Sequence, residues 1–166
     1  EDRKGQGLVL AQSIRTNLIL ANMKGFSTGL FLNEKKIEDV GQNNIASLRI
    51  KTPSIDEIVG QLSGGNQQKV VIGKWVNTDA DIFIFDEPTR GIDVGAKVEV
   101  YNVMNSLVKQ GKCVIMVSSE MPEILGMSDR VIVMRGGEVM AEVDRDSEHF
   151  NQEDLMKAAW GGKLDD

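Results

Sequence analysis

The sequence predicts an α/β fold in which strands and helices alternate along the chain. Two short apolar runs, residues 81–88 (DIFIFDEP) and 113–119 (CVIMVSS), are typical of buried parallel strands. The segment between them, residues 94–112, has the apolar spacing of a helix that ends near Lys109 and Gly111. Because a helix that joins two strands of one sheet makes a right-handed crossover, we expect a layered α/β domain.

The N-terminal third of the chain is polar and mostly helical in pattern. Ser13 can cap a helix over residues 13–22, and residues 33–50 place apolar side chains on one face of a second helix. Pro53 ends that helix, and residues 54–58 (SIDEI) predict a short helix behind a serine cap.

The remaining elements follow from local spacing. Residues 66–77 predict a helix, and residues 121–127 predict a short one. Residues 130–143 predict a β-hairpin with a Gly-Gly turn. Asn151 is expected to cap a last amphipathic helix over residues 151–160.

Composition limits the classes of function. The chain has 166 residues, a net charge of −6 and one cysteine. The acidic charge argues against nucleic acid or anionic lipid as a main partner, although it leaves room for a local basic patch. Cys113 is expected to be a buried thiol in a reducing compartment, and no apolar stretch is long enough to span a bilayer. The chain opens without a methionine, and we expect it to be a piece of a longer protein.

Some side chains leave two interpretations open. Met23, Phe26, Leu30 and Phe31 would form either an exposed apolar patch or part of the interior, and we favour the interior. The only histidine, His149, lies in a polar stretch and is expected at the surface.

The strongest chemical signal is the acidic pair Asp86-Glu87 at the end of the first apolar run. Carboxylates at the carboxyl end of a buried strand lie at the binding edge of the sheet, where one can hold Mg²⁺ and the next can activate water. The alternative is a solvated turn. Ser63, Asp93 and the hydroxyls of Ser118 and Ser119 lie at spacings that would bring them to the same edge.

Three segments together resemble motifs of one known family. Residues 62–69 (LSGGNQQK) resemble the signature motif of ATP-binding cassette (ABC) transporter ATPases, and residues 81–93 resemble their Walker B strand and D-loop. With "SSEMPE", the chain is most similar to the C-terminal part of the second cassette of ribose- and galactose-type sugar importers. The resemblance implies a partial P-loop NTPase domain with a mainly parallel sheet and a β-hairpin near its C-terminus. It implies a helical subdomain over residues 1–66 and the C-terminal half of the ATPase core over residues 67–166.

The resemblance also implies that the protein uses ATP and Mg²⁺. Asp86 would hold the metal ion and Glu87 would be catalytic. The signature serine and glycines would bind the γ-phosphate of an ATP held mainly by the opposite cassette, since a helix N-terminus offers unpaired N–H groups. The implied nucleotide-binding residues are Ser63, Gly64, Gly65, Asn66, Gln67 and Asp93.

The sequence departs from the family pattern in three respects. No G-x-x-x-x-G-K-[ST] phosphate loop occurs, so we expect that this chain alone neither binds ATP tightly nor hydrolyses it. Ser119 takes the position of the catalytic switch histidine, which a serine matches neither in reach nor in charge. Glu1 takes the position of the Q-loop glutamine. These departures predict an asymmetric pair of sites, in which this domain mainly completes the partner cassette's site in trans.

The resemblance implies two protein partners. One is a partner cassette in the same polypeptide, and the other is a transmembrane sugar permease at the cytoplasmic face of the membrane, where this protein would be peripheral. Residues 7–14 would contact the permease or belong to the core, and we favour the core. An open sheet edge would let the isolated chain dimerise or swap.

Two other functions compete with sugar import. One is a soluble ABC-type ATPase that acts on nucleic acid or ribosomes and is not tied to a permease, which the acidic charge disfavours. The other is a regulatory domain without hydrolysis of its own.

Overall fold

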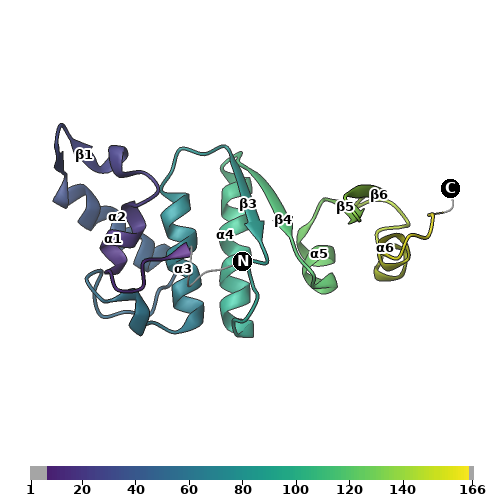
Figure 1. Cartoon of the computed structure of the whole chain (residues 1–166), viewed down its shortest axis with the longest axis horizontal. Coiled ribbons are helices and arrows are strands. Elements are labelled where there is room, and N and C mark those ends of the chain that lie inside the picture. Colours follow the sequence, from purple (N-terminus) through teal and green to yellow (C-terminus); the bar gives the residue numbers. More distant parts are fainter. Residues whose placement is uncertain (1–6, 165–166) are drawn as a thin grey trace. The chain divides into compact units, whose positions relative to one another are not determined.

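The computed structural model describes residues 7–164 and divides the chain into two compact units between Ile115 and Met116 (Figure 1). The elements of the first unit are α1 (Ile14–Ile19), η2 (Met23–Phe26), β1 (Ser27–Thr28), β2 (Phe31–Leu32), α2 (Glu34–Ser47), η3 (Val59–Gln61), α3 (Gly64–Val76), β3 (Ile82–Asp86), α4 (Val94–Lys109) and the start of β4 (Cys113–Val117). Those of the second unit, after the end of β4, are α5 (Met121–Met127), β5 (Arg130–Arg135), β6 (Glu138–Asp144) and α6 (Gln152–Ala159). Among the described residues, no helix is both long and apolar enough to cross a bilayer.

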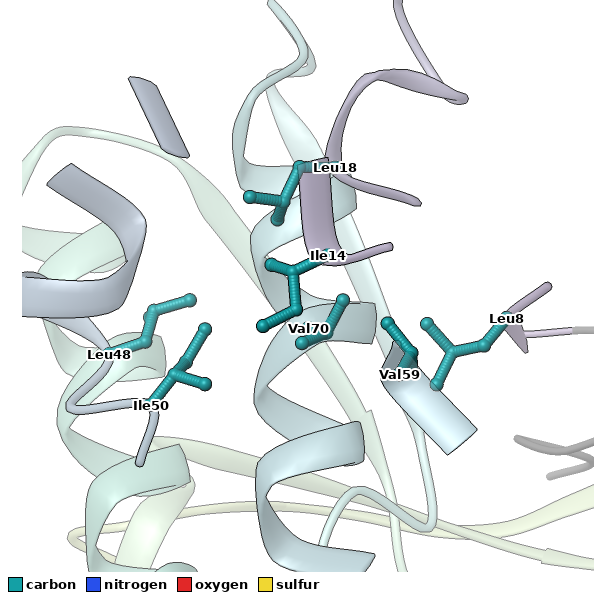
Figure 2. Close-up of a cluster of buried hydrophobic side chains, with 7 residues drawn as sticks. All are labelled: Leu8, Ile14, Leu18, Leu48, Ile50, Val59 and Val70. Carbon is teal, nitrogen blue, oxygen red and sulfur yellow. The ribbon is translucent and has the colours of Figure 1, made fainter. Parts of the chain in front are cut away.

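The largest buried cluster of the first unit packs α1 against α3 (Figure 2). Its members come from α1, α3, η3, the segment before α1 and the segment that ends α2: Leu8, Ile14, Leu18, Leu48, Ile50, Val59 and Val70. Gly73 of α3 makes the close approach of these helices feasible, because a Cβ there would lie 2.9 Å from Leu18 Cδ2 and 2.8 Å from Asn44 Oδ1. Leu8 lies in this cluster, which agrees with a core role for residue 8 in the segment 7–14.

The predicted strand–helix–strand unit is present as β3, α4 and β4. β3 and β4 are hydrogen-bonded neighbours, and the Cys113 N–H donates to the Asp81 carbonyl at 2.8 Å. Cys113 is the first residue of β4 and Asp81 directly precedes β3. Because this bond joins the starts of both strands, the two strands run parallel. The prediction that both strands are fully buried is wrong within the described residues. Ile82 and Ile84 are exposed while Phe83 is buried, because burial of a parallel sheet on both faces needs a helical layer on each face.

Cys113 is exposed, which corrects the expected buried thiol. It lies at the first position of β4, where alternate residues are exposed along the strand. The apolar run around Cys113 predicted the strand correctly, but an apolar run does not distinguish a strand covered on both faces from one covered on a single face.

Residues 54–58 do not form the predicted short helix. Ser13 instead pairs with Ile58 in an isolated antiparallel bridge. The Ile14 N–H donates to the Glu57 carbonyl at 3.0 Å, and the Arg15 N–H donates to the Ile55 carbonyl at 2.8 Å. These carbonyl groups therefore serve the start of α1, where first-turn N–H groups need acceptors outside the helix.

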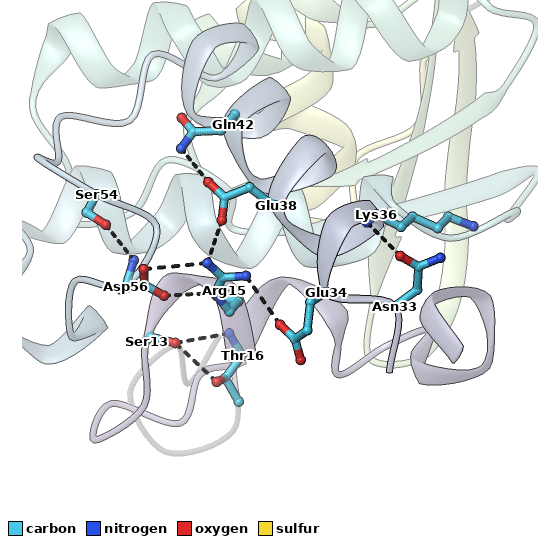
Figure 3. A network of polar contacts seen from close by, with 10 residues as sticks. All are labelled: Ser13, Arg15, Thr16, Asn33, Glu34, Lys36, Glu38, Gln42, Ser54 and Asp56. Atoms are coloured by element: carbon cyan, nitrogen blue, oxygen red, sulfur yellow. Dashed lines mark hydrogen bonds and ion pairs between the residues drawn. The ribbon is translucent and has the colours of Figure 1, made fainter. Parts of the chain in front are cut away.

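A polar cluster around Arg15 ties α1 to α2 and to the segment before η3 (Figure 3). The guanidinium donates to Asp56 Oδ1 at 2.8 Å and to Glu38 Oε2 at 2.5 Å, and lies 3.5 Å from Glu34 Oε2. The hydrogen bond from Arg15 lowers the pKa of Asp56, and hydrogen bonds from Gln42 and then Arg15 lower the pKa of Glu38. The same partners, Asp56 first, raise the pKa of Arg15, which stays charged.

The β1–β2 hairpin was not predicted by the sequence. Phe26, just before it, packs with Ile19 and Ile37 in a small separate core. The expectation that the nearby apolar residues pack inside holds for Phe26 and is wrong for Met23, Leu30 and Phe31, which are exposed. The exposure of Leu30 and Phe31 follows from the tight turn at Gly29, which has a φ of 64° and projects the residues after it away from the core.

The second unit is the predicted hairpin with the last helix packed on it. β5 and β6 pair antiparallel around a turn at Gly136 and Gly137, and α6 adds Leu155 and Ala158 to the apolar cluster of β5 and β6. The Asn151 side chain caps α6 as predicted, accepting from the Asp154 N–H. His149, expected at the surface, is partly buried, with Nδ1 2.9 Å from Asp154 Oδ2, because the carboxylate of the first turn holds the ring.

We expect the Arg15 cluster to make the first unit acid-sensitive. The pKa values of Glu38 and Asp56 are lowered in the folded state from 4.5 and 3.8, so their stabilisation is present above those values and is lost as pH falls through the folded values. Arg15→Gln should lower the thermal unfolding midpoint at pH 7 and flatten its decline between pH 5 and pH 3. Circular dichroism melts check this, with Lys109→Gln as a charge-matched control. Parallel pH profiles for the wild type and Arg15→Gln would contradict it.

Candidate functional site

The N-terminus of α3 presents backbone N–H groups behind an exposed serine. Ser63 is the N-cap residue in an extended conformation, and its hydroxyl makes no capping hydrogen bond. The first N–H bonded back into the helix is that of Gln67, which donates to the Ser63 carbonyl at 2.9 Å. The N–H groups before it belong to Gly64, Gly65 and Asn66. A first turn without a side-chain cap, entered through two glycines, can accept an anion close to the backbone.

Asn66 and Gln67 fix this helix end to the surrounding loops. Asn66 Nδ2 donates to the Ser63 hydroxyl at 3.0 Å, and Asn66 Oδ1 accepts from the Lys51 N–H at 2.9 Å. Gln67 is buried, and its Nε2 donates to the carbonyls of Val59 and Leu62. The predicted nucleotide-binding residues therefore fall into two groups, since Ser63 is exposed while both amides are buried in contacts with the protein itself.

Asp93 lies beside the same helix end. It caps α4, with Oδ1 accepting from the Ala96 N–H at 3.0 Å. A Cβ on Gly65 would lie 3.0 Å from Ala96 Cβ and 3.6 Å from Asp93 Oδ2. Gly65 is therefore needed for the close approach of α3 to the start of α4, and any side chain there would push the two elements apart.

Asp86 and Glu87 stand at the carboxyl end of β3, as predicted. Asp86 is the last residue of the strand and is exposed. Glu87 has a φ of 46°, in the left-handed region that a residue with a long side chain rarely adopts. Such a backbone costs energy that the surrounding structure must hold in place, and these conformations cluster at functional sites. The turn that follows is closed by the Arg90 N–H, which donates to the Glu87 carbonyl at 3.2 Å.

A cavity of about 950 Å³ opens beside this acidic pair, between α3 and β3. Besides Asp86 and Glu87 it is lined by two cations that the sequence analysis did not select, Lys74 and Arg90. Lys74 Nζ donates to the Gly7 carbonyl at 2.6 Å and lies 5.1 Å from the Trp75 ring, and burial lowers its pKa. No local signal singles out Lys74, because α3 also carries the buried polar residues Asn66, Gln67 and Lys69.

The donor set fits part of a magnesium site. No cluster of three or more potential ligand residues occurs within residues 7–164, but Mg²⁺ is commonly held by one or two carboxylates that phosphates and water complement. Asp86, exposed at the strand end, is suited to this role, with Glu87 next to it. The buried Lys74 and the exposed Arg90, which line the same cavity, also match the charge of a polyphosphate.

Two further predicted site residues are Ser119 and Glu1. Ser119 belongs to the second unit and is exposed in the loop after β4. Its neighbour Ser118 donates to the buried carboxylate of Glu123 and accepts from the Glu120 N–H at 3.0 Å, so this loop has a defined conformation. Glu1 falls outside the described residues. The convergence of all four polar clusters at one sheet edge stays a prediction.

Comparison with known proteins shows which family the segment that contains the motifs is similar to. A family model described as ABC transporter matches residues 7–90. The chain is 51% identical over 162 residues to a putative ribose/galactose/methyl galactoside import ATP-binding protein of Rhizobium etli, covering 98% of this chain and 30% of that protein. It is 52% identical over 163 residues to a xylose import ATP-binding protein of Moorella thermoacetica, covering 98% of this chain and 32% of the relative. The chain thus spans about a third of the length of these curated relatives.

Solved structures agree on the fold. An ATP-binding cassette determined as a dimer in a post-hydrolysis state with ADP and phosphate aligns with a TM-score of 0.71 at 20% identity, covering 84% of this chain and 60% of that one. A putative metal-chelate type ABC transporter in an inward-facing conformation aligns with a TM-score of 0.74 at 14% identity, covering 92% and 60%. Both matches place the chain in the P-loop NTPase fold of ABC cassettes.

We expect the left-handed backbone of Glu87 to be measurable as strain. Glu87→Gly and Glu87→Ala both remove the carboxylate, but only glycine adopts a φ of 46° without steric cost. The glycine variant should therefore be more stable than the alanine variant by about 1 kcal/mol, the order of the left-handed penalty for an L-residue. Urea unfolding of the two variants measures the difference. The same exchange at Glu99, inside α4, should favour alanine. A more stable Glu87→Ala would contradict the strain.

Proposed function

This chain belongs to the ABC transporter family, and from that premise we propose that it is part of an ATP-binding subunit that powers sugar import. The relatives that share about half of its residues over 98% of its length are import ATP-binding proteins for ribose, xylose or galactose-type sugars. The whole subunit would couple ATP binding and hydrolysis to transport.

The observation that carries this proposal is the uncapped N-terminus of α3. Ser63 is exposed, its hydroxyl does not cap the helix, and Gly64 and Gly65 place no side chain over the first turn, where a phosphate would bind. Asn66 and Gln67 hold this end in place through the protein backbone, so they act as positioning residues. Asp93 supports the neighbouring turn as the cap of α4.

The cofactors are ATP and Mg²⁺. Asp86 would hold Mg²⁺, which when bound neutralises phosphate charge and polarises the reacting phosphoryl group. Glu87 would accept a proton from the attacking water, and its strained backbone would aim the carboxylate from the end of β3. Lys74 and Arg90 add positive charge to the wall of the same cavity.

The domain would contribute to two ATP sites, the partner cassette's site through the end of α3 and its own site through Glu87, and the first contribution is more complete. The end of α3 retains the serine and both glycines of a γ-phosphate clamp, and this clamp would complete the site of a partner cassette in trans. The site next to Glu87 is weaker, because Ser119 stands at the switch position, where it cannot supply an imidazole. We propose that this domain mainly serves its partner's ATP and that its own site is slow or non-hydrolytic.

The partners of the whole subunit would be a second cassette and a transmembrane sugar permease. The solved relative with ADP and phosphate is a dimer of cassettes, which supports a paired arrangement. The permease would hold the subunit at the cytoplasmic face of the membrane, as a peripheral protein.

We expect the isolated chain to bind ATP weakly, with a dissociation constant no tighter than the micromolar range, since its sequence lacks a phosphate loop and its lysine. Isothermal titration calorimetry with Mg²⁺ and ATP measures this directly. A sub-micromolar constant would contradict the proposal that the main phosphate grip lies outside this chain.

In the full-length subunit, Ser63→Arg should abolish transport, because the arginine side chain occupies the phosphate-binding turn at the start of α3 and the serine hydroxyl is lost. Glu87→Gln should reduce transport less, since it affects the weaker site. Uptake of radiolabelled sugar into proteoliposomes measures both, and Ser106→Arg, at an exposed position of α4, is the matched control. Equal and complete loss from Ser63→Arg and Glu87→Gln would rule out the asymmetry.

A further inference from the structure

We propose that the β1–β2 hairpin and its flanks, residues 23–36, form a contact surface for the anionic lipid headgroups of a membrane. The apolar tip of this surface consists of Leu30 and Phe31, and its lysine cluster consists of Lys24, Lys35 and Lys36. Neither the proposed nucleotide chemistry nor the trans role of α3 is needed for this inference, so the two can fail separately.

The apolar tip is among the most exposed apolar surface of the described residues. Leu30 is 99% exposed and Phe31 is 79% exposed, and the two residues directly follow Gly29 at the turn of the hairpin. Single exposed apolar residues are common on soluble proteins, but two large consecutive ones at an exposed turn are typical of an interaction site. Figure 1 shows the hairpin extending away from α1 and α2 within the first unit.

The hairpin is firmly mounted at its base. Phe26 is buried against Ile19 and Ile37, and its carbonyl accepts from the Asn33 N–H at 2.8 Å. Lys36 Nζ donates to the Gly25 carbonyl at 2.6 Å and lies 5.6 Å from the Phe26 ring. Because the base is already ordered, binding through the tip would cost little conformational entropy.

The charge around the tip is opposite to that of the whole chain. Residues 23–36 hold three lysines and one glutamate, a net charge of +2, whereas the chain carries −6. The carboxylate of that glutamate, Glu34, lies 3.5 Å from Arg15 Nη1, a guanidinium that it shares with Glu38 and Asp56. The acidic remainder of the chain would be repelled by anionic lipid, which leaves the hairpin as the face that approaches it.

The shape of the surface favours a bilayer over a protein groove. Leucine and phenylalanine at an exposed turn, with lysines in the flanking segments, match the boundary between acyl chains and headgroups, where apolar side chains enter and basic ones meet phosphate. A protein partner would have to supply a concave pocket that fits both side chains. The bilayer accommodates them without a matching shape.

Vesicle flotation of this chain tests the proposal. The wild type should float with vesicles of phosphatidylglycerol and phosphatidylcholine, should float far less with phosphatidylcholine alone, and should be released by salt. The double variant Leu30→Ser, Phe31→Ser should lose about tenfold in partitioning, since two large apolar side chains leave the lipid boundary. The double variant Val94→Ser, Val98→Ser is the matched control, because it removes two exposed apolar residues from α4.

A second measurement guards against an unfolded variant. Phe31→Trp should show a blue-shifted emission with anionic vesicles and quenching by brominated lipid, as a tip that enters the acyl boundary requires. Circular dichroism should be the same for all variants. The proposal is overturned if the wild type does not bind anionic vesicles, if both double variants lose binding equally, or if binding needs a membrane protein in the vesicle.

Discussion

The packing of α1 against α3 is the contact on which the first unit depends. Leu18 and Val70 are fully buried in one cluster, and Gly73 lets the helices come close enough for this packing. Because one face of α3 is held this way, its N-terminal turn points outward with Ser63 exposed. The apolar packing of α3 therefore orients the polar end of the helix. The buried amide of Gln67 holds that end in the same orientation, because it donates to the Val59 and Leu62 carbonyls.

The acidic pair obeys a different constraint. Asp86 is placed by the end of β3, and Glu87 is placed by a backbone that only the adjoining turn can hold at a φ of 46°. The nearby cavity joins these carboxylates to Lys74 and Arg90, so opposite charges face one volume. One unit thus contains an uncapped helix end suited to an anion and a carboxylate pair suited to a cation.

Local patterns predicted most elements but not their surroundings. Caps and turns were readable because Ser13, Asn151 and the Gly136-Gly137 pair act on backbone groups close in sequence. The segment 54–58 was misassigned because its carbonyls bond to α1, far away in sequence. The role of Lys74 could not be predicted either, since its place in a cavity depends on how α3 packs against β3. Motif recognition located Asp86 and Glu87, while the strain at Glu87 needed the backbone geometry.

The exposed position of Cys113 has a chemical consequence. A solvent-accessible thiol at the start of β4 is open to oxidation and to alkylating reagents, whereas the same thiol under a layer of helices would be protected. The rate of its alkylation is therefore a natural gauge of whether this sheet face is covered. In an oxidising solution the same thiol can link two chains covalently, so purification of this chain requires a reductant.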